Sequence, residues 1–285
     1  MDIKGKYGLI TGAASGIGRA TACALAKAGA AGIALADLDE TGLKETARLV
    51  EAAGAKALVI PCDVTDRDAQ TRMFGTAESG FGRLDIVHNN AGTICGEPIW
   101  PECSLEKIEL VVSVNLIGVM FGTRLAVETL SRHGGGVVIN TASTASLGPM
   151  PADPMYSGTK TAVVNLVHSS AGLAASHGVR VNAILPGMTR TAFIDRTGDG
   201  TKPAEWLGPA LAQSTMLTPD QIAAGVLTLI EDDERAGECL IVDNPPGPDA
   251  APVETRLRNP VEFYDFVAGR TRAMAEMMAK QANAD

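Results

Sequence analysis

The chain has 285 residues, of which 46% are apolar and only 4% aromatic, and it carries a formal net charge of −9. This acidic balance argues against a surface built to neutralise nucleic-acid phosphates or anionic lipids. We therefore expect neither a nucleic acid nor a membrane as a partner. The length alone leaves one large domain or two small ones open.

The five cysteines are scattered along the chain and form no CxxC pair. Neither a disulfide framework nor a metal site is expected from such spacing. The chain starts with a charged segment and not with a signal-like apolar stretch. It also lacks an uninterrupted apolar run of about 18 residues, which a membrane span requires. Together these features predict a cytoplasmic protein.

Short apolar runs alternate with longer amphipathic segments up to residue 243. The runs predict seven strands, at residues 8–11, 33–37, 57–61, 84–88, 137–140, 179–185 and 239–242. Helices are predicted between them, at residues 16–28, 41–53, 66–80, 105–131, 155–176 and 219–231. The alternation predicts an α/β fold, a doubly wound parallel sheet with helices on both faces. Residues 1–243 would form one domain, with a substrate loop at about 188–217.

The remaining segment, residues 244–285, begins with a proline-rich stretch that breaks the pattern. Asn259, Pro260 and Glu262 then stand in the order of an N-cap, a first-turn proline and a capping-box partner. Apolar residues recur beyond them at helical spacing, at Phe263, Phe266, Val267, Met274, Met277 and Met278. We expect a terminal amphipathic helix that packs on its own or a neighbouring subunit and is not an independent domain. A sharper hypothesis is that Phe263, Phe266 or residues 274–278 border a substrate entrance.

A glycine-rich segment, from Gly12 to Gly18, follows the first predicted strand directly. Gly12 permits a tight turn, while Gly16 and Gly18 let the backbone approach a pyrophosphate and let the helix pack closely on the sheet. The N–H groups that open the helix, with Ser15 and Ile17 among them, would receive the phosphates. A simple turn could have the same residues. The prediction of a dinucleotide site therefore depends on the strand before this segment and the helix after it.

Asp37 ends the second predicted strand, 19 residues after Gly18. Its carboxylate can accept hydrogen bonds from the adenosine ribose and would repel a 2′-phosphate, so NAD is expected in preference to NADP. Asp37 could instead cap the next helix, although Asp39 is the better candidate for that role. Arg19 could favour NADP, but it lies inside the predicted helix.

The spacing of the glycine-rich segment resembles the TGxxxGxG loop of the short-chain dehydrogenase/reductases. Further motifs of that family occur in order, as Asn89-Asn90-Ala91-Gly92, Tyr156-Ser-Gly-Thr-Lys160 and Pro186-Gly187-Met-Thr189-Arg-Thr191, together with Asn115 and Ser143. The resemblance extends over residues 5–243. It implies a Rossmann fold, an NAD-dependent oxidoreductase, and a homo-oligomer, commonly a homotetramer that pairs the helices near residues 105–131 and 155–176.

Tyr156 and Lys160 are four residues apart, so they share one face of a helix. A free tyrosine has a pKa of about 10, and both a lysine ammonium and the positive nicotinamide ring would lower it. Tyr156 is therefore predicted to be the general acid/base. The resemblance implies that Ser143 hydrogen-bonds the substrate oxygen, that Lys160 also binds the ribose hydroxyls, and that Asn115 holds a water.

The resemblance also implies further cofactor contacts. Asp63 and Val64 would meet adenine, Asn89 and Gly92 the adenosine side, and Thr189 and Thr191 the carboxamide and pyrophosphate, in the segment that begins at Pro186 and Gly187. Asp63 could instead cap the helix that starts near residue 66. Asn90 is expected to be structural.

The substrate pocket is expected from residues 150–155, Met188 and the loop at 193–217, which are mostly apolar. These residues favour an apolar or alicyclic alcohol as substrate. Asp153 could bind a polar group of the substrate, but its position between two prolines favours a turn residue. One alternative is a 3-oxoacyl thioester reductase, which Asp37 opposes because reductive biosynthesis more often uses NADPH. A second is a catalytically silent NAD(H)-sensing regulator, which the complete set of Ser143, Tyr156 and Lys160 opposes.

Overall fold

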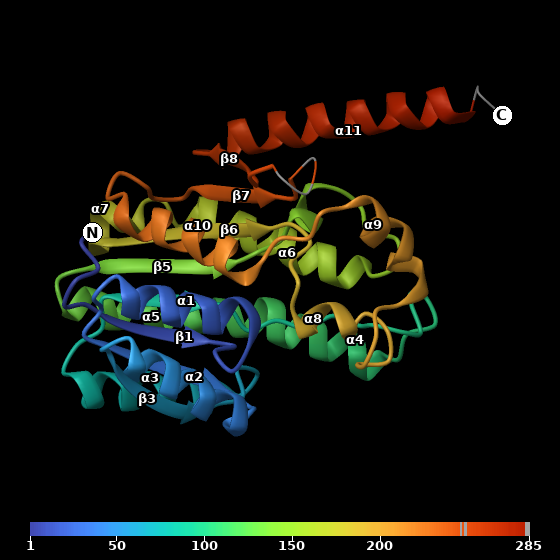
Figure 1. The fold of residues 1–285 in the computed structure, drawn as a ribbon. Helices are drawn as coiled ribbons and strands as arrows, with labels where there is room; N and C mark the ends of the chain where they lie inside the picture. The colour runs from blue at the N-terminus through green and yellow to red at the C-terminus, as the bar shows by residue number, and fades with distance from the viewer. Residues whose placement is uncertain (246, 248–249, 283–285) are drawn as a thin grey trace.

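The computed structural model describes residues 1–245, 247 and 250–282, without the side chains of residues 213, 274 and 277–282. One sheet runs through the molecule in the order β3-β2-β1-β4-β5-β6-β7-β8 (Figure 1). Its strands are β1 (Tyr7–Thr11), β2 (Gly32–Asp37), β3 (Lys56–Pro61), β4 (Ile86–Asn89), β5 (Gly136–Thr141), β6 (Val179–Pro186), β7 (Cys239–Asp243) and β8 (Val253–Leu257). The first seven are parallel, and β8 pairs antiparallel with β7.

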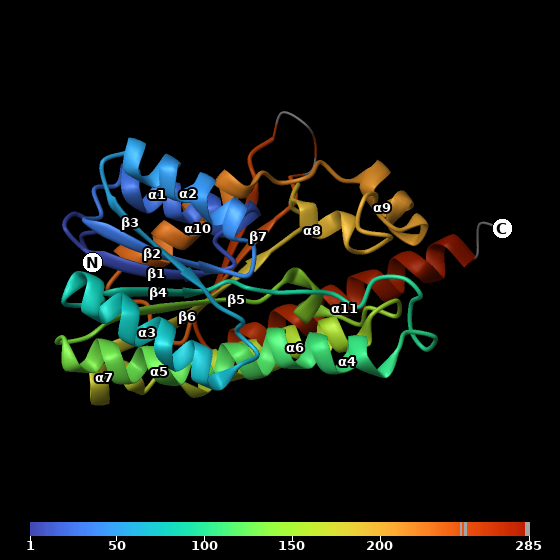
Figure 2. The same ribbon diagram turned by 90° about the horizontal axis from the view of Figure 1, so that it is seen from below.

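Helices cover both faces of this sheet, as Figure 2 shows. On one face lie α1 (Gly16–Lys27), α2 (Glu40–Ala52) and α10 (Pro219–Glu231). On the other lie α3 (Arg67–Phe81), α4 (Leu105–Val112), α5 (Val119–Arg132), α6 (Pro154–Ser169) and α7 (Leu173–His177). Each layer has its own buried apolar cluster between helices and sheet. The doubly wound α/β fold expected from the sequence is thus confirmed.

The prediction of seven strands is wrong by one, because β8 lies at the edge beyond β7. Only Leu257 of its five residues is buried, and Glu254 and Arg256 are exposed. Apolar runs cannot reveal a strand of this kind, since its backbone hydrogen bonds and not its side chains attach it to the sheet.

Two of the predicted long helices are interrupted. Residues 105–131 divide into α4, a π-helical turn at Ser113–Gly118, and α5. Residues 155–176 divide into α6 and α7, with a break at 170–172. A π-helical turn inserts extra backbone into a helix and often occurs at functional sites. Here it carries Asn115.

The helical segment Leu105–Arg132 is also long and apolar enough, by length and composition alone, to cross a membrane, with a mean hydropathy of 1.8 over 18 residues. Charged residues interrupt this segment, so a search for an uninterrupted apolar run does not find it. Of that window, 44% is buried inside the protein against neighbouring elements. Core helices of folded domains pass the same test of length and hydropathy.

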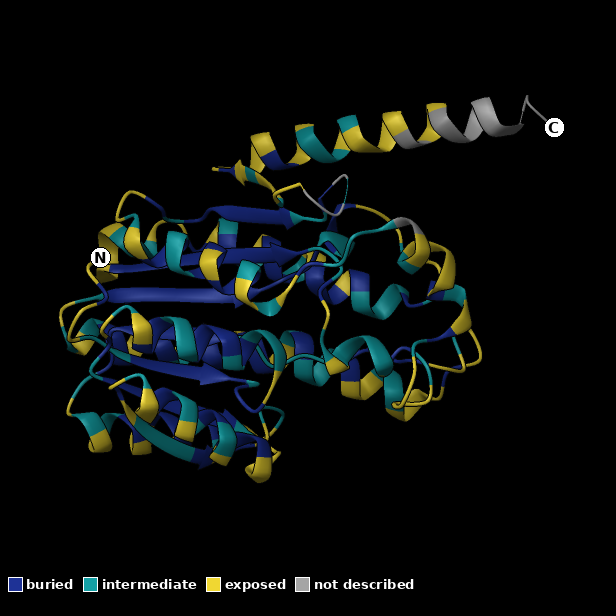
Figure 3. Cartoon of the chain, viewed as in Figure 1, coloured by how far each residue is buried: buried dark blue, intermediate teal, exposed yellow. Residues whose placement is uncertain are grey.

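The terminal helix α11 (Pro260–Ala282) begins as the sequence predicts. The N–H of Glu262 donates to Asn259 Oδ1 at 3.0 Å, and Asn259 Nδ2 donates to Glu262 Oε1 at 3.2 Å. Phe263 is buried against the core, with its ring edge-on to His168 at 5.4 Å, and Phe266 packs on the same core. The helix then extends past the sheet, and most of its described turns are exposed (Figure 3).

This packing answers the hypothesis about the tail in part. Phe263 and Phe266 pack on the core and do not border a substrate entrance. Ala275, in the turn 274–278 that the hypothesis also named, lines the cavity described below, together with Arg270 and Thr271. The side chains of Met274, Met277 and Met278, which the same hypothesis named, lie outside the described residues.

Replacement of Phe263 by alanine tests this anchor. Phe263 is 2% exposed, so we expect Phe263→Ala to lower the free energy of unfolding by about 3–5 kcal/mol, through lost burial and the cavity left behind. Chemical unfolding measures this. The neighbouring Tyr264 is 55% exposed, and Tyr264→Ala should change stability by less than about 0.5 kcal/mol. Equal losses for both variants would show that α11 is not anchored as described.

Candidate active site

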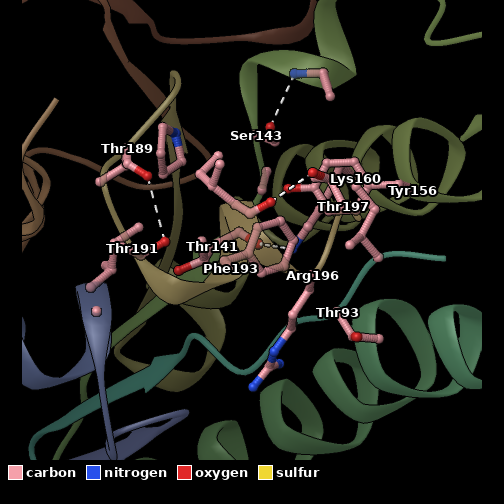
Figure 4. Close-up of a pocket in the computed structure, with 18 of the residues that line it drawn as sticks. Thr93, Thr141, Ser143, Tyr156, Lys160, Thr189, Thr191, Phe193, Arg196 and Thr197 are labelled. Atoms are coloured by element: carbon pink, nitrogen blue, oxygen red, sulfur yellow. Dashed lines mark hydrogen bonds between the residues drawn. The ribbon is translucent and has the colours of Figure 1, made fainter. Parts of the chain in front are cut away.

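A cavity of about 890 Å³ opens at the carboxyl ends of the parallel strands (Figure 4). Most of the residues that the sequence marked as functional line it, namely Gly12, Ser15, Gly16, Ile17, Asp37, Asp63, Val64, Gly92, Ser143, Tyr156, Lys160, Pro186, Gly187, Thr189 and Thr191. In an open parallel sheet, the carboxyl edge is where ligands bind. The sequence predicts these residues at strand ends or on the helices that follow them, and the fold brings them together around one space.

The glycine-rich turn joins β1 to α1 at one side of the cavity. Gly12 and Gly16 have φ angles of +66° and +53°, which favour glycine. Gly18 serves packing and not the cavity, because a Cβ there would lie 2.1 Å from the carbonyl oxygen of Gly12. Ser15 is the N-cap of α1 but makes no capping hydrogen bond with its side chain, which leaves its hydroxyl available to a ligand.

Asp37 lies at the cavity wall and is tied to the glycine-rich turn. Its Oδ2 accepts the N–H of Ala14 at 3.0 Å, and its Oδ1 accepts the N–H of Leu38 at 2.7 Å. Asp39, not Asp37, caps α2, by accepting the N–H of Gly42 at 3.0 Å. Arg19 donates to Thr46 Oγ1 at 3.0 Å and to backbone carbonyls, so its guanidinium is held beneath the turn.

Asn89 and Asn90 stand at the end of β4, and both have a structural role, although only Asn90 is expected to have one. Asn89 is buried and donates to Asn140 Oδ1 at 2.8 Å, so it joins two strands and does not face the adenosine side. Asn90 lines the cavity and also holds the glycine-rich turn, with Nδ2 donating to the carbonyls of Thr11 and Gly12 at 3.1 and 3.3 Å. The helix α3 is capped by Asp66, which leaves Asp63 at the cavity.

Helix α6 carries Tyr156 and Lys160 into the cavity, and a buried aspartate sets where it starts. Asp153 accepts the N–H of Tyr156 at 2.9 Å and that of Cys95 at 2.7 Å. It is therefore a helix cap and a link to the loop after β4, as its turn context indicated, and not a substrate ligand. Lys160 Nζ donates to the carbonyl of Thr141 at 2.8 Å and lies 5.7 Å from the centroid of the Tyr156 ring.

Burial governs the ionisation of this pair. It raises the pKa of Tyr156 to about 12, although a hydrogen bond with Ser143 opposes that rise. It also lowers the pKa of Lys160 to about 8. The sequence had predicted a tyrosine whose pKa the lysine lowers; in the protein alone, loss of solvation is the larger influence on both groups.

Asn115 lies behind the cavity wall, beside Lys160. Its side chain accepts the N–H of Thr93 and donates to the Thr93 carbonyl, both at 2.8 Å. A Cβ on Gly92 would lie 3.4 Å from Asn115 Oδ1 and 3.6 Å from Lys160 Nζ. Both polar groups therefore lie close to Gly92, at ordinary contact distance from a side chain placed there.

Several residues of the cavity were not predicted individually. The ring of Phe193, in α8 (Ala192–Asp195), lies 5.7 Å from that of Tyr156. Arg196 follows in the same loop, and Arg270 and Thr271 come from α11. The sequence predicts that the loop at 193–217 contributes to the pocket, but for the terminal helix it indicates only the apolar residues as candidates. Helical spacing from Phe263 places Arg270 on the same face of the helix, but only the attachment of the tail to the core brings that face to the cavity.

Comparisons with known proteins agree with this site. The family model described as short chain dehydrogenase matches residues 6–201. Bovine 15-hydroxyprostaglandin dehydrogenase [NAD(+)] is 37% identical over 260 residues, which cover 87% of this chain and 94% of the relative. The 3beta-hydroxysteroid dehydrogenase 2 of Eggerthella lenta is 36% identical over 250 residues, 85% of this chain and 94% of the relative.

Among solved structures, 3-ketoacyl-(acyl-carrier-protein) reductase from Brucella melitensis, complexed with NADH, matches with a TM-score of 0.75 and 28% identity. The match covers 86% of this chain and 99% of that one. Sequence motifs, strand-edge cavity and relatives therefore agree, and the chain belongs to the short-chain dehydrogenases.

Proposed function

We propose that the protein is an NAD-dependent oxidoreductase that interconverts a secondary alcohol and a ketone, with Tyr156 as general acid/base. The observation that carries this proposal is the placement of Ser143, Tyr156 and Lys160 in one cavity with the glycine-rich turn. The enzyme class and the cofactor predicted from the sequence agree with the relatives, whose names specify secondary-alcohol dehydrogenases and NAD(+).

The residues at the cavity fit a dinucleotide. The start of α1 presents backbone N–H groups and the hydroxyl of Ser15 to phosphates. Asp37, at the end of β2, and Asp63, after β3, line the same cavity. A carboxylate at Asp37 favours a ribose with free hydroxyls over one with a 2′-phosphate. When bound, NAD⁺ supplies the hydride acceptor and a positive charge near the phenol.

Ser143, Tyr156 and Lys160 each have a separate role in the proton transfer. The Ser143 hydroxyl hydrogen-bonds the substrate oxygen and aligns it with the phenol. Tyr156 removes the proton of the alcohol in oxidation and returns it to the ketone oxygen in reduction. The Lys160 ammonium, next to it in the buried site, stabilises the phenolate. We further propose that Asn115 positions a water that links Lys160 to solvent.

The wall of the substrate side is apolar, with Ile94, Leu147, Met150, Phe193, Trp206 and Leu207 among its residues. It supports an apolar or alicyclic secondary alcohol. A 3-oxoacyl thioester reductase is the alternative that the Brucella melitensis neighbour favours. Asp37 opposes an NADPH-dependent reductase, but that neighbour is complexed with NADH, so activity with hydroxyacyl thioesters is what separates the two functions. A silent NAD(H) sensor would have no use for the Tyr156 and Lys160 pair.

Tyr156→Phe tests the mechanism. Loss of the phenolic hydroxyl should lower kcat for NAD⁺-linked oxidation of a confirmed alcohol by at least about a hundredfold, since general acid/base catalysis contributes that much or more. NADH formation at 340 nm measures the rate, and fluorescence titration should show NADH binding retained. Tyr7→Phe, in β1 and stacked on Phe81, is the control and should keep the rate. Full turnover in Tyr156→Phe would contradict the proposed role.

Asp37→Asn tests the cofactor. Removal of the negative charge, with an acceptor oxygen kept for the Ala14 N–H, should reduce the preference for NAD⁺ over NADP⁺ by about tenfold, or 1.4 kcal/mol. The measurement is kcat/KM for both cofactors. A wild-type protein that prefers NADPH, or an unchanged ratio in the variant, would argue against Asp37 as the discriminating group.

We also propose a homo-oligomer, with a tetramer favoured. Exposed apolar side chains on α4, the π-helical turn and α5 support it, at Leu105, Leu110, Ile117 and Met120. The mass in solution, from light scattering, is expected to be a multiple of 29.5 kDa, and a monomeric mass would contradict the proposal. A cytoplasmic location remains a prediction.

A further inference from the structure

Charged side chains are unevenly distributed around the cavity. The acidic residues that line its described part are Asp37, at the end of β2, with Asp39 and Asp63, just after β2 and β3. Arg270 lines the cavity too, but it comes from α11, the helix that follows the last strand. The cavity thus has an acidic adenosine end and, far from it in the sheet order, an arginine.

The position of Arg270 follows from how α11 is anchored. Phe263, Val267 and Arg270 are spaced to share one helix face, and the first two pack on the core. Arg270 Nη1 donates to Asp243 Oδ2 at 3.0 Å, which holds the guanidinium at the carboxyl end of β7. Thr271 beside it also lines the cavity.

The sheet order gives the approximate distance to the catalytic group. Ser143 comes shortly after β5, and β7 is the second strand beyond β5. Neighbouring strands are about 4.8 Å apart, so β7, whose Asp243 holds Arg270, lies about 10 Å across the sheet from β5, the strand that precedes Ser143. Asp37, on β2, is five strands from β7, or about 24 Å. Arg270 is therefore at the substrate end and not at the adenosine end.

Arg196 is the other arginine that lines the cavity, and it comes from the loop after β6. A Cβ on Gly96, in the loop after β4, would lie 2.5 Å from the Arg196 carbonyl oxygen, and Phe193 of the same segment lies against the Tyr156 ring. Figure 4 shows the Arg196 side chain near the loop that carries Thr93. Arg196 therefore borders the loop after β4, and Arg270 is the separate cation that the tail supplies.

We propose that Arg270 binds a carboxylate of the substrate, so that the enzyme acts on apolar secondary alcohols that carry a carboxylate several methylene groups from the carbinol carbon. This inference rests on the proposed function and specifies its substrate class. Apolar residues that line the same cavity, with Leu147, Met150 and Met188 among them, would accommodate the methylene chain.

Arginine suits this role because its planar guanidinium offers five N–H donors in the geometry of a carboxylate. One of these donors is used by Asp243, and the others remain for a ligand. Asp243 also offsets part of the positive charge, so recognition depends on directed hydrogen bonds more than on net charge. Since the Arg270 side chain is 42% exposed, water competes, and the contribution to affinity is modest.

The test compares hydroxy fatty acids of increasing length with their methyl esters, which keep the alcohol and lose the negative charge. We expect the wild-type protein to show a higher kcat/KM for the acids with NAD⁺. In Arg270→Gln, the ratio of kcat/KM for acid to that for ester should fall about tenfold, as for loss of one charge-assisted hydrogen bond. Arg272→Gln, on the exposed part of the same helix, is the matched control and should leave the ratio unchanged.

Three results would overturn the inference. The first is an equal kcat/KM for acid and ester in the wild-type protein, and the second is an equal fall of the ratio in Arg272→Gln. The third is a weaker Kd for NADH in Arg270→Gln, measured by fluorescence, which would place Arg270 against a cofactor phosphate. Absence of NAD⁺ reduction with every acid would also overturn this inference, whereas absence of NAD⁺ reduction with alicyclic and other secondary alcohols as well would contradict the proposed function.

Discussion

The site depends on one geometric constraint, namely that seven parallel strands end at the same edge of a buried sheet. Each strand delivers a group to that edge when its chain turns back toward a helix. Gly12 follows β1, Asp37 ends β2, Asp63 follows β3, and Ser143 follows β5. Because the register is continuous across the sheet, groups from distant parts of the chain line one space without any movement of the backbone.

Within that space, burial acts against the charged forms of Tyr156 and Lys160. A buried phenol resists loss of its proton, and a buried ammonium resists keeping its proton. The Thr141 carbonyl accepts a hydrogen bond from Lys160, which favours the ammonium, and this group lies close to the Tyr156 ring. In the proposed mechanism, the positive charge of a bound NAD⁺ would add to that of Lys160 and favour the phenolate, which would couple the proton step to cofactor binding.

Sequence was sufficient where a residue type is dictated by local backbone geometry. The positive φ angles of Gly12 and Gly16 permit little but glycine, and the spacing of Tyr156 and Lys160 is one helical turn. A few neighbouring residues are enough to predict these features. The structural role of Asp153 could be predicted for the same reason, since it lies between prolines at the start of a helix.

Sequence was insufficient where a role depends on contacts between distant segments. Asn89 and Asn90 are adjacent at a strand end and point in opposite directions, so pairing with β5 and not residue type decides which one faces the cavity. Asn89 meets Gly122 of α5, where a Cβ would lie 2.4 Å from its Oδ1. Arg270 could not be placed either, because its location depends on where β8 and Phe263 attach the tail to the body.

The attachment of β8 to β7 also bears on how the sheet can grow. An open strand edge offers unpaired N–H and carbonyl groups to any second chain, and proteins protect such edges with short, charged strands. β8 satisfies the backbone of β7 along its whole length and presents Glu254 and Arg256 outward. Two molecules therefore cannot join their sheets through β7 unless β8 is first displaced, so the tail that carries Arg270 also guards the fold against edge-to-edge aggregation.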